Sequence, residues 1–263
     1  MTVPTSAQNG SQLAVEIAVQ DLDGVRVALD AGANRIELCA ALETGGLTPS
    51  AAMTERAVTL AAEHGRTDFV HVLIRSRPGD FVYTEDELAV MHRDVEFAAG
   101  IGVSGVVLGT LTPQCSVDHD AVRRLCEAAA GAQITFHRAI DVVPDPRDEV
   151  QWLAEAGVTR ILTSGGAGRV GDGVAGIRDV AAEGLVEVMA GGGLVVADLS
   201  AVAQAGAAAV HSSARRTVTG LPVGPGGGAA EWTRTDPDLV GELVAAAAGL
   251  NVSRIRGAAA PSH

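Results

Sequence analysis

The sequence predicts a single-domain (β/α)8 barrel, or TIM barrel, and three observations support this prediction. Between residues 13 and 213, short β-branched or apolar runs alternate with longer alanine-rich stretches, and eight such units can be counted. A glycine follows several expected helices just before the next strand, as at Gly32, Gly157 and Gly206, which is a common helix C-cap. No GxGxxG pattern follows the first strand, so a closed barrel is favoured over a doubly wound sheet.

The expected elements follow in chain order. Strands are expected at Leu13–Val19, Arg35–Cys39, Phe69–Arg75, Gly105–Gly109, Gln133–Arg138, Arg160–Ser164, Val186–Ala190 and Ala209–Ser213. Helices are expected at Asp23–Ala31, Ala51–Glu63, Glu85–Ala99, Asp120–Ala130 and Pro146–Ala156, with a last one at about Asp236–Ala248. The glycine-rich stretch Thr217–Ala230 is expected to be a loop, a flexible flap over the catalytic face. We expect a barrel at residues 13–248 between a disordered N-terminal tail, 1–12, and a C-terminal tail, 249–263.

Composition narrows the class of partner. The formal net charge of −13, with only 19 basic residues, argues against a nucleic-acid partner and against an anionic membrane surface. The first residues show no secretory signal, and no apolar run is long enough to span a bilayer. Three cysteines without CxxC spacing suit a reducing compartment. The sequence therefore predicts a cytoplasmic protein.

The interior of the predicted barrel is unusually polar. Side chains along a barrel strand alternate between the helix layer and the interior, and here the interior phase carries the polar residues. That phase holds Glu16, Glu37, Cys39, His71, Arg75, Thr135, His137, Glu187, Met189, His211 and Ser213. One interpretation is a buried network of ion pairs and hydrogen bonds without chemistry. The other is a polar cavity that opens at the carboxyl ends of the strands, where neighbouring Glu and His groups would serve acid–base catalysis.

Two kinds of strand-end motif suggest how a ligand would bind. The clusters Ser164-Gly165-Gly166 and Gly191-Gly192-Gly193 follow the sixth and seventh strands, where many barrels bind phosphate through backbone N–H groups, although each would also suit a tight turn. Ser212 and Ser213 would add hydroxyl donors. In His137-Arg138-Ala139-Ile140-Asp141, the guanidinium would hold an anion, whereas a salt bridge that fixes the loop is the alternative.

The same residues resemble the signature blocks of the CutC family over nearly the whole chain, residues 13–215. These blocks are Arg35–Ala41, Gly45–Ser50, Gly79–Tyr83, Gly105–Gly109, Thr135–Arg138, Leu162–Gly166, Met189–Gly193 and His211–Ala214. The resemblance implies a (β/α)8 barrel and a cytoplasmic role in copper homeostasis, with a cysteine pair on the first two strands binding copper. Here Ala18 occupies the first of those places and only Cys39 matches. Because Cu(I) prefers two or three soft ligands, Met189 or a histidine would have to complete a site.

Three hypotheses follow. The first is a copper protein in which Cys39 binds Cu(I). The second is an enzyme that acts on a small anionic or phosphorylated metabolite by isomerase- or lyase-type proton transfer, and no strand carries the lysine that a Schiff-base aldolase needs. The third is a non-catalytic scaffold, and alanine-rich outer helices are consistent with a homo-oligomer, a dimer or tetramer. Candidate catalytic residues are Glu37, His137, Glu187 and Glu16, and candidate substrate-binding residues are His71, Arg75, Arg138, Asp141, Ser164, Gly165, Gly192, Gly193, His211 and Ser212.

Overall fold

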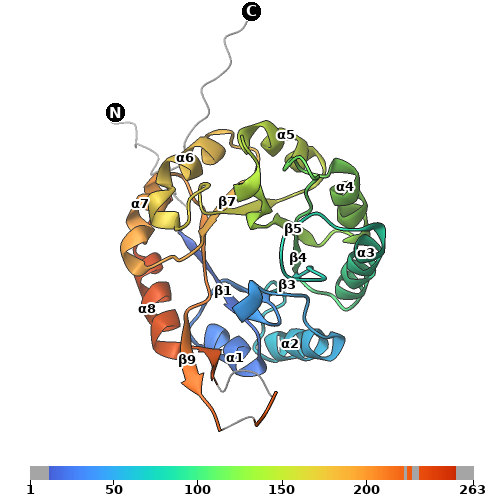
Figure 1. The fold of residues 1–263 in the computed structure, drawn as a ribbon. Coiled ribbons are helices and arrows are strands. Elements are labelled where there is room, and N and C mark those ends of the chain that lie inside the picture. Colours follow the sequence, from blue (N-terminus) through green and yellow to red (C-terminus); the bar gives the residue numbers. More distant parts are fainter. Residues whose placement is uncertain (1–11, 222–223, 227–230, 253–263) are drawn as a thin grey trace, which may run out of the picture.

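Eight parallel strands form a closed barrel inside a ring of helices in the computed structural model, which describes residues 12–221, 224–226 and 231–252 (Figure 1). The barrel strands are β1 (Ala14–Val19), β2 (Arg35–Leu38), β3 (Val70–Leu73), β4 (Gly105–Leu108), β5 (Gln133–Phe136), β6 (Arg160–Thr163), β7 (Glu187–Gly191) and β8 (Ala209–Ser212). The helices are α1 (Leu22–Asp30), α2 (Ala51–Glu63), α3 (Glu85–Gly100), α4 (His119–Ala128), α5 (Arg147–Glu155), α6 (Val174–Ala182), α7 (Leu199–Gln204) and α8 (Pro237–Ala248). Pairing of β1 with β8 closes the barrel, so the predicted fold class is confirmed.

The strands divide their side chains between two environments as the alternation predicts. Val15, Ile17, Ile36 and Leu38 are at most 2% exposed and belong to the main apolar core, which lies between the strands and the helices. The opposite phase carries the polar groups into the interior. Burial of the apolar face against the helix layer holds each strand in this phase, because a shift by one residue would bury the wrong side chains.

Local signals explain where the helices begin and end. Thr84 and Glu87 form a reciprocal capping box at the start of α3, and the Ser50 side chain caps α2. Gly157 follows α5 with φ of 96° and Gly206 follows α7 with φ of 94°, a left-handed conformation that glycine adopts without strain. The glycine stops expected from the sequence are therefore confirmed at these helices.

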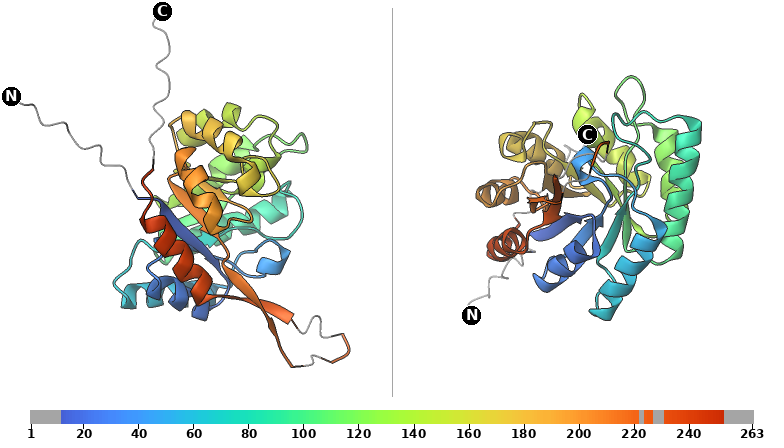
Figure 2. Two further views of the ribbon diagram at one scale, coloured as in Figure 1. Left: turned by 90° about the vertical axis from the view of Figure 1, so that its left-hand side faces the viewer. Right: turned by 60° about the horizontal axis from the view of Figure 1, so that its bottom comes forward.

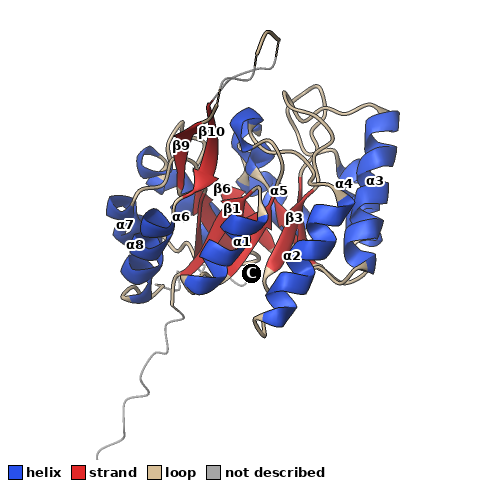
Figure 3. Ribbon diagram, turned by 90° about the horizontal axis from the view of Figure 1, so that it is seen from below, coloured by secondary structure: helices blue, strands red, loops and turns tan. Residues whose placement is uncertain are grey.

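The expectation of a loop over Thr217–Ala230 is wrong at its start. Strands β9 (Arg215–Thr219) and β10 (Glu231–Thr235) form an antiparallel ribbon that projects from one end of the barrel (Figures 2 and 3). Threonine, valine and tryptophan favour extended strands. The glycine-rich segment between the two strands made the whole stretch resemble a loop in the sequence. The Glu43 carboxylate, in the connection after β2, accepts hydrogen bonds from the N–H and hydroxyl of Thr233 in the middle of β10 and so ties the ribbon to the barrel.

The ends of the described chain lie together. Gln12 forms an antiparallel bridge with Asn251, so the last residue of the expected N-terminal tail contacts the start of the expected C-terminal tail. Residues 1–11 and 253–263 of those tails lie outside the described residues. Among the helices that the structure describes, none combines the length and apolarity required to cross a membrane.

Candidate functional site

The amino-terminal end of the barrel is filled by an ion-pair network. Arg35, Arg160 and Glu187 are the first residues of β2, β6 and β7. A Glu187 carboxylate oxygen accepts from Arg35 at 3.0 Å and from Arg160 at 2.7 Å, and Arg35 also donates to Glu16 at 2.7 Å. Arg160 donates further to the Thr135 hydroxyl at 3.0 Å. This part of the interior matches the interpretation of a buried network, which stabilises the barrel end opposite the usual active-site face.

Two candidate residues lie in this lower region. Glu187 is bound by two arginines whose hydrogen bonds and charges outweigh the effect of burial and lower its pKa, so the carboxylate is held as an ionised partner. His71 is 1% exposed, and burial lowers its pKa to about 4. Arg35 and Arg160 were missed as interior residues. The signal was present for Arg35, because it lies two positions before Glu37 in the same alternation phase.

The middle of the barrel brings together a carboxylate, an imidazole and a second carboxylate. Glu16 on β1 lies between β2, which carries Glu37, and β8, which carries His211. The Nδ1 atom of His211 lies 2.8 Å from Glu16 Oε1, and its Nε2 atom lies 3.6 Å from Glu37 Oε2. Glu16 is fully buried, whereas the side chains of Glu37 and His211 are 8% and 13% exposed. Thus three candidate residues from three strands form one constellation.

The charges in this constellation are unequal. Burial favours the neutral form of Glu16, but the His211 hydrogen bond and the charge of Arg35 outweigh it, so the pKa of Glu16 is lowered. Burial also opposes the charge on His211, yet the hydrogen bond to Glu16 and the charge of Glu37 raise its pKa. For Glu37, burial prevails over the attraction of His211 and raises the pKa. Glu37 is therefore the carboxylate of this constellation that gains a proton more readily.

At the carboxyl ends of β3 and β5, Arg75 and His137 are both buried, at 7% and 5% exposure. Arg75 donates to the carbonyl oxygens of Gly45, Gly46 and Gly79, so it fixes two loops at the mouth of the barrel. The His137 imidazole lies against Gly109 of the neighbouring chain segment, where a Cβ atom would approach the ring to 2.5 Å. Burial and then the charge of Arg75 lower the pKa of His137 to about 3, which keeps the imidazole neutral.

Candidates after β5 and β6 form a second mouth cluster. Arg138 donates to Asp141 at 2.9 Å and to the Ser164 hydroxyl at 3.1 Å. Asp141 also accepts from the backbone N–H groups of Ser164 and Gly166, so the predicted loop-fixing salt bridge is present. Gly165 approaches Gly173 so closely that no side chain would fit, which gives this glycine a packing role.

The loop after β7 joins this cluster at the mouth. The Gly192 carbonyl accepts from Val170 N–H at 2.8 Å, and the Gly193 carbonyl accepts from Arg169 at 3.1 Å. A Cβ atom on Gly192 would lie 3.0 Å from the Arg138 guanidinium carbon. The two glycines therefore let the loop pass close to Arg138 and Arg169.

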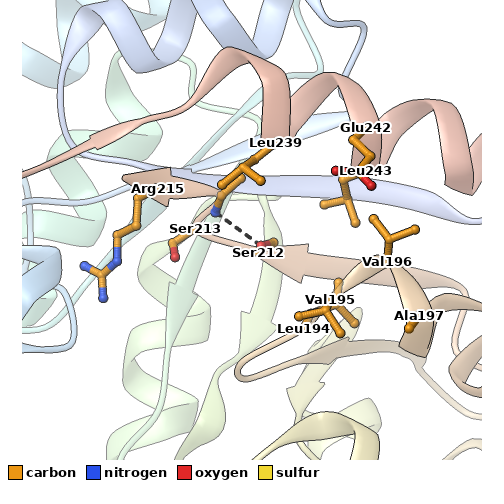
Figure 4. A pocket seen from close by; sticks show the side chains of 11 residues that line it. Leu194, Val195, Val196, Ala197, Ser212, Ser213, Arg215, Leu239, Glu242 and Leu243 are labelled. Atoms are coloured by element: carbon orange, nitrogen blue, oxygen red, sulfur yellow. Dashed lines mark hydrogen bonds between the residues drawn. The ribbon is translucent and has the colours of Figure 1, made fainter. Parts of the chain in front are cut away.

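A groove of about 520 Å³ runs beside the mouth, between the loop after β7, the end of β8 and helix α8 (Figure 4). Ser212, Ser213 and Arg215 line it together with apolar side chains, among them Val195 and Leu239, which are 45% and 44% exposed. Ser212 uses its hydroxyl to accept the Ala214 N–H at 3.2 Å. The volume of the groove falls in the range of small-molecule binding sites.

Unpaired positive charge gathers at the same end of the barrel. The arginines that form no ion pair among the described residues are Arg75, Arg169, Arg178 and Arg215. Arg178 lies on the outer helix α6, whereas Arg75, Arg169 and Arg215 follow β3, β6 and β8 at their carboxyl ends. In a protein with a net charge of −13, this placement makes the mouth attractive to anions.

The surroundings of Cys39 do not suit a Cu(I) site. Its thiol is 1% exposed and packs with Leu73 and Val107, and its sulfur lies 3.7 Å from the Glu37 carbonyl oxygen. Burial, followed by the charge of Glu37, raises the pKa of the thiol well above its usual value, which opposes formation of the thiolate that binds metal. Met189 belongs to a different apolar cluster and its sulfur faces Arg35 at 3.3 Å. Across residues 12–252, leaving out the undescribed positions, no group of three His, Cys, Asp or Glu side chains is placed to hold a metal ion.

The chain is thus a (β/α)8 barrel in which two carboxylates and an imidazole meet in the interior. Comparisons with known proteins identify its family. The CutC family model matches residues 13–216. A family protein CutC from Agrobacterium fabrum is 43% identical over 182 residues, covering 68% of this chain and 70% of the relative. A family protein CutC from Xylella fastidiosa is 39% identical over 246 residues, covering 89% of each chain. The chain belongs to the CutC family.

Solved structures agree with this assignment. The chain is similar to a protein from Streptococcus agalactiae that bears the name copper homeostasis protein CutC. The TM-score is 0.71, and the identity is 31% over 76% of this chain and 98% of that chain. It also resembles a thiamine phosphate pyrophosphorylase from Pyrococcus furiosus, with a TM-score of 0.57 and 16% identity over 89% and 95% of the two chains. The latter similarity shows the fold alone.

Proposed function

We propose that the protein is an enzyme that moves a proton on a small anionic metabolite at the carboxyl end of the barrel. The observation that carries this proposal is the constellation of Glu16, His211 and Glu37 in the barrel interior. The pKa of Glu16 is lowered and that of Glu37 is raised. Neighbouring titratable groups whose pKa values are shifted in opposite directions are common in proton-transfer sites. In this proposal Glu37 exchanges the proton with the substrate, and Glu16 orients His211.

Arginine side chains at the mouth of the barrel support an anionic substrate. Arg75, Arg169 and Arg215 carry charges there that no carboxylate neutralises among the described residues. The groove beside Ser212 and Ser213 would accommodate the remainder of a small molecule. An isomerase- or lyase-type reaction α to a carboxylate or phosphorylated group fits this combination of a buried base and nearby cations.

Proton exchange with solvent tests the proposal directly. We would incubate the protein in D2O with a panel of small organic acids and phosphorylated sugars and follow loss of C–H signals by NMR. We expect exchange with at least one member of the panel, a loss of at least 100-fold in Glu37→Gln, and wild-type behaviour in Glu183→Gln, which alters an exposed glutamate at the end of α6. Exchange that survives Glu37→Gln unchanged would reject Glu37 as the proton-transfer group.

Copper binding at Cys39 stays a prediction that rests on the family resemblance and on the name of the Streptococcus agalactiae relative. A competition titration with a Cu(I) chelator would decide it. Cys39→Ser should abolish Cu(I) binding if the prediction holds, whereas the control Cys126→Ser, on helix α4, should leave it unchanged. Equal binding by both variants would exclude Cys39 as the ligand. Location in the cytoplasm and assembly into a dimer or tetramer also stay predictions.

A further inference from the structure

Buried polar atoms without a partner concentrate at one place in the barrel. Six buried side-chain nitrogen or oxygen atoms in the described residues lack a hydrogen-bond partner. Five of them lie in the connections that follow β3, β4 and β5, which are neighbouring strands. These five atoms are Arg75 Nε, Ser76 Oγ, Tyr83 OH, Thr110 Oγ1 and His137 Nε2. Each unpaired buried donor costs about 1–3 kcal/mol, so such a concentration calls for a ligand.

The orientation of His137 makes its free nitrogen a donor. Its Nδ1 atom accepts the Ala139 N–H at 3.2 Å, which places the ring proton of the neutral imidazole on Nε2. The absence of a side chain at Gly109 leaves room for the ring in this position. The Nε2–H group is therefore held rigidly, buried and unused.

Arg75 lies near the same aromatic ring as His137. Phe81 lies 4.8 Å from the His137 ring centroid, and the Arg75 guanidinium carbon lies 5.2 Å from the Phe81 centroid. The Phe81 carbonyl accepts the Leu111 N–H at 2.8 Å, which draws the connection after β3 against Thr110. The Tyr83 hydroxyl lies beside Arg75 without forming a hydrogen bond of good geometry. The Phe81 ring thus packs against both His137 and Arg75.

The charge balance of this set identifies the kind of ligand. Arg75 is 7% exposed, and its described hydrogen-bond acceptors are neutral carbonyl oxygens. A buried guanidinium without a counter-charge is unfavourable, and a bound anion would supply that charge. Arg75 Nε and His137 Nε2 are both out of contact with solvent and lack a hydrogen-bond partner among the described residues. A carboxylate has two acceptor oxygens, one for Arg75 Nε and one for His137 Nε2.

We propose that Arg75, Thr110 and His137 form a carboxylate-binding subsite beneath Phe81, which holds one carboxylate of the substrate. The inference rests on the proposed function only where it calls the ligand a substrate. Carboxylate binding itself is measurable without turnover. Phe81 and its connection must move aside for the ligand to enter. The subsite desolvates the carboxylate and places the rest of the molecule toward the centre of the barrel, where Glu37 lies.

Acetate and formate are the minimal probes for this subsite. We would titrate each, and inorganic phosphate in parallel, while observing histidine side-chain nitrogens by NMR, with the His137 signals assigned from His137→Phe. We expect acetate to shift the His137 Nε2 signal saturably in the wild type, in Glu37→Gln and in His92→Phe, a control on the surface of α3. Acetate affinity should fall at least tenfold in His137→Phe and about threefold or more in Thr110→Val, judged by thermal shift.

Each outcome decides the proposal. If acetate and formate produce no saturable shift, the five atoms are satisfied by water and the subsite does not exist. Acetate binding that is unaffected in both His137→Phe and Thr110→Val would place the anion elsewhere. If phosphate shifts His137 as strongly as acetate, the assignment to carboxylates is wrong. Binding of acetate by Glu37→Gln, together with no proton exchange by the wild type, would support the subsite and reject the proposed enzyme function.

Discussion

Replacement of Gly109 by alanine tests whether the position of His137 depends on a missing side chain. A Cβ atom at residue 109 would approach the Cε1 and Nδ1 atoms of His137 to 2.5 Å, whereas ordinary contacts are 3.4–4 Å. The imidazole would have to retreat by about 1 Å. It has little room to do so, because Phe81 and Phe136 flank it with ring centroids 4.8 and 6.1 Å away and the Cβ of Ala139 crowds the same point.

Overpacking of this kind costs about 1–3 kcal/mol of unfolding free energy. Alanine also has less conformational freedom than glycine in the unfolded chain, which stabilises the folded protein by about 0.4–1 kcal/mol. The net expected destabilisation is therefore about 1–2 kcal/mol. Gly100→Ala is the matched control: its Cβ meets nothing within 4 Å at the end of α3, and alanine there should stabilise by about 0.5–1 kcal/mol.

Urea unfolding of both variants, and of Gly109→Ala in a His137→Ala background, provides the assay. Without the imidazole, the cost of Gly109→Ala should fall below about 0.5 kcal/mol, because the clash is gone. The reasoning is refuted if Gly109→Ala is as stable as Gly100→Ala. It is refuted equally if the cost is the same with and without the His137 ring.

Three further outcomes are expected. Glu16→Gln should lower the free energy of unfolding by about 3 kcal/mol in urea unfolding, because a buried network loses its shared carboxylate, and a loss below 0.5 kcal/mol would contradict this. His71 and His137 have folded pKa values of about 4 and about 3, below the unfolded value of 6.5, so their contribution to stability is lost as pH falls. Unfolding measured at pH 6 and pH 5 should show a loss of about 2 kcal/mol, and an unchanged stability would count against neutral buried rings. Iodoacetamide should modify exposed Cys115 before buried Cys39 in mass spectra, and the reverse order would be inconsistent with the thiol environments.

Much of the candidate site was predictable because it depends on alternation along single strands. Glu16, Glu37 and His211 were placed in the barrel interior from the phase of their own strands, before any partner was known. The same reasoning extends to Arg35 but was not applied to β6, where Arg160 begins the strand. What alternation cannot give is height along the barrel axis, because that depends on the register between strands.

Position along the barrel axis distinguishes interior residues that the sequence alone does not. Glu187 and Glu37 share the interior phase, yet Glu187 lies at the amino-terminal end between Arg35 and Arg160, whereas Glu37 lies beside His211. These partners are up to about 170 residues apart in the chain, so no local pattern pairs them.

Strand alternation, helix periodicity and glycine caps are local properties, so the (β/α)8 class, the order of its elements, the polar interior and the family could all be predicted from the amino-acid sequence. Tertiary structure alone decided which polar groups meet. It paired β9 with β10 across a glycine-rich connection, and it brought Arg75 and His137 against Phe81. The physical reason is that barrel closure fixes the register of distant strands, and that register selects the partner of each buried charge.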